Sequence, residues 1–173
     1  MIAALPAVLL AALHGCSAWP SRAESSLTRA AADGWTSRLH DPGEFAFRTW
    51  QRGDTDDGDL LVVIEGDGRA WRSRRRPSAD PTPTHAVGLD LALASGAGNV
   101  LYIGRPCQFL ERARPAGCEA RWWTSHRYAP AVVTALSDAI DAATGDPGPS
   151  GGVTLLGYSG GGVLALLLAA ARE

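Results

Sequence analysis

The sequence predicts one α/β domain with a mostly parallel sheet, and three observations lead to this class. Short apolar runs at residues 60–64, 100–103 and 153–156 have the length and composition of strands buried on both faces. Longer segments with helical spacing alternate with these runs, as in strand–helix–strand units. The 173 residues, of which 46% are hydrophobic and 20% charged, are enough to build one buried core.

The first sixteen residues predict an export signal. Residues 2–13 are apolar, too short to span a bilayer, and lead into Leu13-His14-Gly15-Cys16. This stretch resembles a bacterial lipobox, which implies lipidation of Cys16. An ordinary cleaved signal peptide and a buried N-terminal helix are the alternatives. We therefore expect a lipoprotein-type signal at 1–15, a tether at 16–24 and the globular domain at 25–173, in the bacterial envelope, the periplasm or the medium.

The first part of the domain predicts a helix followed by two strands. Ser21 and Glu24 have capping-box spacing, and the helical pattern that follows ends at Asp33-Gly34. Residues 35–39 and 45–50 have strand character. The acidic stretch 51–59 is expected to be a hairpin loop and not a calcium loop, because Asp59 stands where an EF-hand requires glycine. The net charge of −2 argues against nucleic acid as a partner.

The middle of the chain contains a basic and aromatic segment, RAWRSRRR, at residues 69–76. We interpret it as a solvated surface loop, with a substrate-contacting loop as the alternative. The DPTP sequence at 80–83 interrupts regular structure, and helical spacing resumes over 86–97. Pro130 suits the first turn of another helix. The apolar face of that helix would be formed by Val132, Val133, Leu136, Ala139 and Ile140.

Cys107 and Cys118 form an even pair once Cys16 is assigned to the signal. In an oxidising compartment they could close a small loop as a disulfide, although two unrelated buried thiols are the alternative. There is no C-x-x-C motif and no His/Cys cluster with ligand spacing, so no metal site is expected.

The most informative stretch is 151–173, GGVTLLGYSGGGVLALLLAAARE. A short strand-like run enters a glycine-rich turn, and an apolar helical pattern from Val163 leaves it. Gly157, Ser159 and Gly161 fill the G-x-S-x-G spacing of a nucleophile elbow. In such a turn the serine oxygen projects freely, and side chains two residues away on either side would collide with backbone. A structural glycine turn is the alternative.

Four segments together resemble an α/β-hydrolase of the serine esterase or lipase type, more narrowly the small secreted or lipid-anchored bacterial members. They are LLVVIEGDGRAW, DPTP, NVLYIGRPCQF with WWTSHRYAPAVV, and GYSGGGVLALLLAA. The resemblance implies that Ser159 is the nucleophile of ester hydrolysis through an acyl-enzyme, without metal or organic cofactor. It also implies that the N–H groups of Gly160 and Asp67 form the oxyanion hole, with the Asp67 carboxylate turned away. Gly66, Gly68 and Tyr158 are candidates for the substrate loop.

The partners of the serine do not follow it in this sequence. In the family the acid and then the histidine come after the serine, whereas only fourteen residues follow Ser159 and Glu173 is their only acid. We interpret His85 and His126 as exposed or capping residues. The expectation is a truncated hydrolase whose sheet edge and last helix are exposed. A non-catalytic envelope lipoprotein that binds through the same fold, and an acyltransferase, are the alternatives.

Overall fold

The computed structural model describes residues 22–53, 58–110, 117–145 and 150–172. The predicted signal peptide, Cys16 and Glu173 lie outside these residues. No helix in the described part of the chain is both long enough and apolar enough to cross a membrane.

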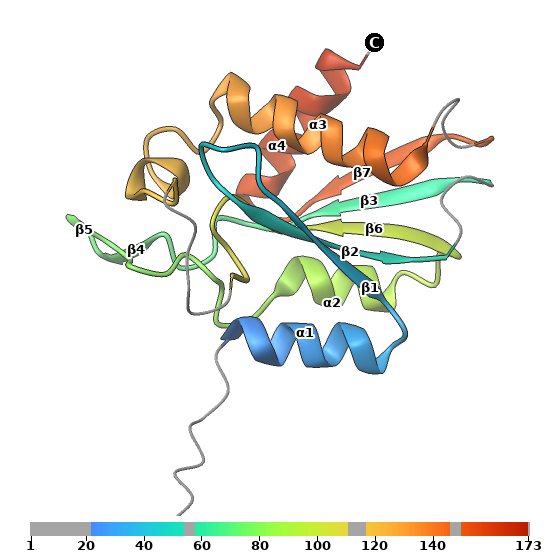
Figure 1. The fold of residues 1–173 in the computed structure, drawn as a ribbon, viewed down its shortest axis with the longest axis horizontal. Helices are drawn as coiled ribbons and strands as arrows, with labels where there is room; N and C mark the ends of the chain where they lie inside the picture. Colours follow the sequence, from blue (N-terminus) through green and yellow to red (C-terminus); the bar gives the residue numbers. More distant parts are fainter. Residues whose placement is uncertain (1–21, 54–57, 111–116, 146–149, 173) are drawn as a thin grey trace, which may run out of the picture.

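A five-stranded mixed sheet forms the centre of the molecule, with the order β1-β2-β6-β3-β7 (Figure 1). The strands β6, β3 and β7 pair in parallel, and β2 pairs antiparallel with β1 on one side and β6 on the other. The expected α/β class is therefore present, with a parallel half and an antiparallel half. The strands are β1 (Thr36–His40), β2 (Phe47–Arg52), β3 (Leu60–Ile64), β6 (Asn99–Ile103) and β7 (Val153–Gly157).

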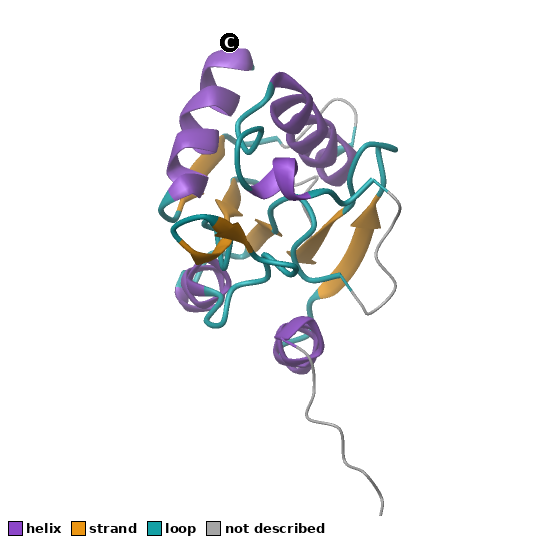
Figure 2. Cartoon of the chain, turned by 90° about the vertical axis from the view of Figure 1, so that its left-hand side faces the viewer, coloured by secondary structure: helices purple, strands orange, loops and turns teal. Residues whose placement is uncertain are grey.

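Helices cover both faces of this sheet: α1 and α2 lie on one face, and α3 and α4 lie on the other (Figures 1 and 2). Pro130 occupies the first turn of α3, as its fixed φ and missing N–H favour. A single 3₁₀ turn, η1 (Ala120–Trp123), precedes α3. The helices are α1 (Arg22–Ala32), α2 (Val87–Ala94), α3 (Pro130–Thr144) and α4 (Gly160–Ala171).

The period-2 alternation of the strands divides the core into two clusters. In β3, Leu60, Val62 and Ile64 pack on the face covered by α3 and α4, whereas Val63 packs on the face covered by α1 and α2. Every one of these four side chains is at most 1% exposed. This burial on both faces confirms the expectation drawn from the apolar run and holds the carboxyl end of β3 rigidly in place.

Three local expectations need correction. The segment after β2 is not a hairpin loop, because β6 lies between β2 and β3 in the sheet. The basic segment 69–76 is exposed apart from Ala70, as expected of a solvated loop, but it forms a two-stranded ribbon, β4 (Trp71–Ser73) and β5 (Arg76–Pro77). Finally, α1 (Arg22–Ala32) is the helix that the capping-box spacing predicted, but its start at Arg22 lies inside the 16–24 range expected to be a tether.

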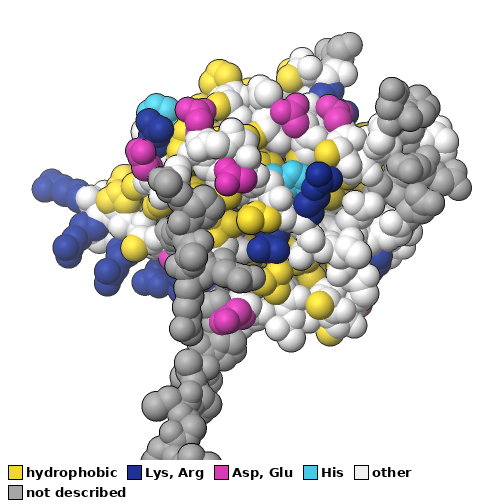
Figure 3. Space-filling view, in the orientation of Figure 1, with side chains coloured by type: hydrophobic (Ala, Val, Ile, Leu, Met, Phe, Trp, Pro, Cys, Tyr) yellow, Lys and Arg dark blue, Asp and Glu magenta, His cyan; other side chains and the backbone are white. Residues whose placement is uncertain are grey.

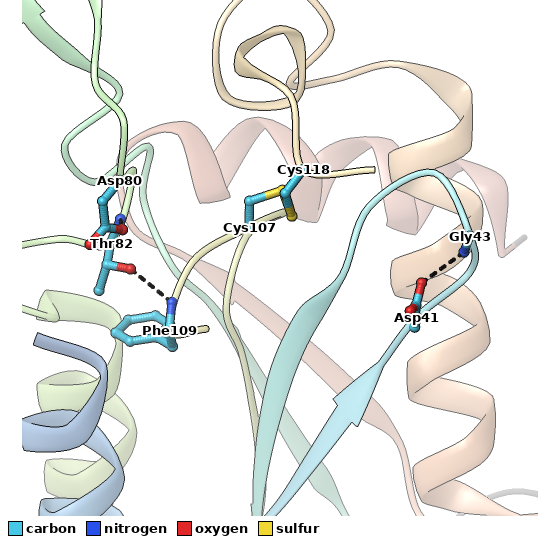
Figure 4. Close-up of a disulfide and its surroundings, with 7 residues drawn as sticks. All are labelled: Asp41, Gly43, Asp80, Thr82, Cys107, Phe109 and Cys118. Atoms are coloured by element: carbon cyan, nitrogen blue, oxygen red, sulfur yellow. Dashed lines mark hydrogen bonds between the residues drawn. A yellow bond between two sulfur atoms is a disulfide. The ribbon is translucent and has the colours of Figure 1, made fainter. Parts of the chain in front are cut away.

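The expected disulfide is present between Cys107 and Cys118. Figure 4 shows it beside the turn that contains Asp41 and Gly43, which joins β1 to β2. The Cys107 N–H also donates to the carbonyl of Ala46 at 2.7 Å. The segment after β6 is thereby tied to the antiparallel half of the sheet. Disulfides form and persist mainly in oxidising compartments, so this bond favours a non-cytoplasmic environment.

The strand β7 is the last strand at its side of the sheet, and the adjoining face of α4 is exposed. Leu166 on α4 is 75% exposed, and Val163 and Leu167 beside it are also exposed. A groove of about 690 Å³ runs between β7 and α4 and is lined by residues that include Leu155 and Ala165. This confirms the expected open edge and apolar helix face.

Candidate active site

Ser159 has a backbone conformation that serine rarely adopts. Its φ is 52° and its ψ is −120°. It follows β7 and Tyr158 in the chain and immediately precedes the first residue of α4. A non-glycine residue held in such a region costs roughly 1–3 kcal/mol, and such strain concentrates at functional sites. The side chain of Ser159 is exposed. The strained turn that the G-x-S-x-G spacing predicts is therefore present.

The two outer glycines of the motif are required by close backbone contact. A Cβ on Gly157 would collide with the backbone of Gly161 and Gly162, and a Cβ on Gly161 would collide with the carbonyl oxygens of Ile64 and Glu65. The turn is closed by a 2.8 Å hydrogen bond from the Gly161 N–H to the Tyr158 carbonyl. This is the physical reason that the sequence analysis gave for the spacing.

The expected oxyanion residues lie next to each other. Gly160 is the first residue of α4, so its N–H has no partner one turn earlier within the helix. The N–H of Asp67 makes no hydrogen bond to any described residue. However, the expectation that the Asp67 carboxylate turns away from the elbow is wrong, since its Oδ1 occupies the position where a Cβ on Gly160 would point.

Two arginines explain how the Asp67 carboxylate is tolerated there. Arg105 Nη1 donates to Asp67 Oδ1 at 3.1 Å, and Arg127 Nε lies 3.6 Å from Oδ2 as an ion pair without a hydrogen bond. Arg105 is only 3% exposed and also donates to the carbonyl of Arg127 at 2.8 Å. Burial lowers the pKa of Arg105 from its ordinary value, and the charge of Asp67 opposes that shift.

Glu65 is a second acid at the carboxyl end of β3, and it is almost fully buried. Its carboxylate accepts hydrogen bonds from the N–H of Gly66 at 2.8 Å, the N–H of Gly88 near the start of α2, and the hydroxyl of Tyr102 at 2.8 Å. Burial and the nearby charge of Glu65 raise the pKa of Tyr102 well above its ordinary value. Glu65 therefore ties β3, β6 and α2 together beneath the site.

Further contacts hold the loop that follows β3. Gln108, which is 1% exposed, donates from Nε2 to the carbonyl of Gly66 at 3.0 Å. Gly68 has a φ of 61°, and a Cβ there would collide with the carbonyl oxygen of Pro81. The N–H of Arg69 donates to that same carbonyl at 2.9 Å. The DPTP segment thus supports the predicted oxyanion loop. Its Thr82 in turn accepts a hydrogen bond from the N–H of Phe109 at 2.9 Å (Figure 4).

A cavity of about 550 Å³ opens beside Ser159. The predicted residues Asp67, Gly68, Tyr158 and Ser159 line it, whereas Gly66 lies behind the ring of Tyr158. Arg69 and Trp71 of the basic segment also line it, in agreement with the alternative of a substrate-contacting loop, and the lining is completed by Glu65, Pro83, Thr84, His85 and Val87. The size is within the range of small-molecule binding sites.

The histidines of the described part of the chain differ in their relation to this cavity. His85 lines it and is exposed. His126 lies elsewhere, where its Nδ1 is 2.9 Å from the hydroxyl of its neighbour Ser125. His40 lies on β1, at the opposite side of the sheet from β7, and contacts Thr49 Oγ1 at 2.9 Å. No described histidine hydrogen-bonds Ser159.

The elbow motif indicated Ser159, and the loop after β3 indicated Asp67, but no motif indicated the charged residues Arg105 and Glu65 beside them. Glu65 follows the buried strand β3 directly and Arg105 comes two residues after β6, so their positions in the sequence were an available signal. Among the described residues, no group of three or more His, Cys, Asp and Glu side chains has an arrangement that could hold a metal ion. Comparison of the chain with family models, with curated proteins and with solved structures finds no match.

Proposed function

We propose that this chain is a serine hydrolase of the α/β-hydrolase type that acts on an ester or related acyl bond through Ser159. One observation supports it above the others: the exposed Ser159 has a φ of 52° between a parallel strand and a helix N-terminus. A structural glycine turn would place glycine at that residue, where the conformation costs nothing. The presence of serine in this strained conformation is explained if its hydroxyl has a function.

In the proposed reaction, the Ser159 Oγ attacks the acyl carbonyl carbon and loses its proton to a base. The carbonyl oxygen becomes an oxyanion beside the N–H groups of Gly160 and Asp67, at the positive end of α4. Collapse of this intermediate breaks the bond to the alkoxide oxygen, which takes the proton back from the base and leaves as the alcohol, so that an acyl group stays on the serine. Water then attacks this acyl-enzyme, which releases the carboxylic acid and restores the serine hydroxyl. The positive charge of Arg105, which donates to the Asp67 carboxylate, weakens the repulsion between that carboxylate and the oxyanion.

An alkyl fluorophosphonate probe tests the assignment of the nucleophile. We expect the folded protein to be labelled, because the probe requires a nucleophilic serine beside an oxyanion site, and we expect Ser159→Ala to abolish the label. Intact-protein mass spectrometry measures the stoichiometry, and peptide mapping identifies the modified residue.

Ser125→Ala is the matched control, since Ser125 is the described serine that contacts a histidine side chain. We expect this variant to be labelled like the parent. We also expect His85→Gln to change the labelling rate by less than about threefold, because no described acid orients His85. Label that moves to Ser125, or no label in a sample shown by circular dichroism to be folded, contradicts the proposal.

The alternative is a non-catalytic binding module on the same fold. The observation in its favour is that no described histidine hydrogen-bonds Ser159. A serine without a base is a weak nucleophile. The fluorophosphonate experiment separates the two functions, because a binding module would remain unlabelled while folded.

We further propose that the protein is exported and anchored to the membrane through a lipid on Cys16. In this proposal the membrane is contacted only by the anchor, and the substrate is a small ester. The lipobox-like sequence before Cys16 and the Cys107–Cys118 bond support this proposal. Cys16→Ser should abolish metabolic labelling with an alkyne fatty acid in a bacterial host, whereas Cys118→Ser should retain it. Labelling that persists in Cys16→Ser overturns the anchor.

A further inference from the structure

We infer that the arginine-rich ribbon β4–β5 is a binding site for an anionic group on the substrate of the Ser159 cavity. The substrate class is an acyl ester that carries a carboxylate or phosphate away from its reactive bond. The inference rests on the proposed function only for the identity of that bond.

The ribbon stands at the rim of the cavity. Arg69 and Trp71 belong to the same cavity lining as Ser159. The base of the ribbon is fixed, because the N–H of Arg69 donates to Pro81 and the N–H of Ser78 donates to the carbonyl of the buried Ala70, both at 2.9 Å. Arg69 is therefore held beside Ser159, and the other arginines of the segment follow it along the ribbon that leaves this rim.

Five of the sixteen arginines of the chain lie within these eight residues, and no acid interrupts them. Arg72, Arg74 and Arg75 are exposed, as are the arginines at either end of the segment. Figure 3 shows basic side chains projecting together from the side of the molecule where β4 and β5 lie. Within the described residues none of the five forms an ion pair, so their charges face solvent.

Of the acids near the cavity, Asp67 and Asp80 are already paired with arginines outside the ribbon and so do not offset its charge. The buried Glu65 keeps one negative charge, against the five positive charges of the ribbon. The carboxylate of Glu65 accepts three donors, Asp67 is paired with Arg105 and Arg127, and Asp80 at the base of the ribbon is paired with Arg22 at 3.2 Å. The local excess of positive charge contrasts with the net charge of −2 of the whole chain. A concentrated field of one sign at a cavity attracts ligands of the other sign.

The cavity also offers an apolar surface for the rest of such a substrate. Trp71 is 47% exposed and Tyr158 is 42% exposed, and both line the cavity. Arginine is suited to carboxylates and phosphates because its planar guanidinium donates in pairs and stays charged at any physiological pH. Binding should therefore weaken as the salt concentration rises.

The test measures equilibrium binding in the Ser159→Ala background, which leaves esters intact. Titration calorimetry gives the dissociation constants of mono-4-nitrophenyl adipate and of 4-nitrophenyl hexanoate, which differ by one carboxylate. We expect R72Q/R74Q/R75Q to weaken adipate binding relative to hexanoate binding about five- to tenfold at 10 mM salt. The effect should fall below about twofold at 500 mM, where charges are screened within a few ångströms.

The matched control is R29Q/R38Q/R121Q, which removes three exposed arginines from α1, β1 and η1 and changes the net charge equally. We expect it to alter the adipate-to-hexanoate ratio less than twofold. An equal effect of both triple variants, or no effect of the ribbon variant, overturns the inference. If the ratio shifts as expected but Ser159 is not labelled by the fluorophosphonate, the anion site stands and the proposed hydrolase function fails.

Discussion

Gly161→Ala is expected to lower the free energy of unfolding by about 2–4 kcal/mol. The new Cβ would overlap the carbonyl oxygens of Ile64 and Glu65, which belong to the central strand β3 and to the residue after it. Neither backbone group is free to move, since β3 is paired in parallel on both sides. Overpacking against rigid backbone is therefore relieved only by displacing α4 or the elbow.

Gly162→Ala is the control, one residue along the same helix. A Cβ on Gly162 would meet only the Gly157 carbonyl oxygen, at 3.4 Å, which is ordinary contact. Because alanine favours a helix over glycine, we expect this variant to be unchanged or more stable by up to about 1 kcal/mol. Urea unfolding followed by circular dichroism measures both variants. Equal stabilities of the two would contradict the assigned backbone contact.

Arg105→Met is expected to destabilise the protein by about 2–4 kcal/mol. The substitution retains the apolar volume but removes the guanidinium that donates to Asp67 and to the carbonyl of Arg127. Removing one member of a buried ion pair leaves the other charge incompletely compensated. The loss is smaller than for a fully buried pair, because the Asp67 side chain is 33% exposed to water.

Two further variants assign this effect to the pair. Arg121→Met removes an exposed arginine whose Nε lies 3.6 Å from Glu119, and it should cost less than about 0.5 kcal/mol. Combining Asp67→Asn with Arg105→Met should be less destabilising than the sum of the single substitutions by at least about 1 kcal/mol. Additive urea-unfolding energies in this cycle would show that Arg105 acts only through packing or through its bond to Arg127.

Much of the fold could be predicted because its signals are local. The buried strands β3, β6 and β7 were visible as short apolar runs, and Pro130 indicated where α3 begins. The order of the strands was less accessible, since pairing is decided between segments far apart in the chain. The turn-like residues after β2 suggested a hairpin, but β6, some fifty residues later, pairs with β2 instead.

In the candidate site, too, local features could be predicted from the sequence and long-range contacts could not. The sequence by itself determined the elbow, because the collision that requires glycine at 157 and 161 arises from residues only a few positions apart and from the adjacent strand. Only the tertiary structure decided the orientation of the Asp67 carboxylate, since it depends on Arg105, which is 38 residues away. Tertiary structure also placed His85 and the arginine ribbon beside Ser159, because charged surface residues carry no periodic pattern that specifies which cavity they will face.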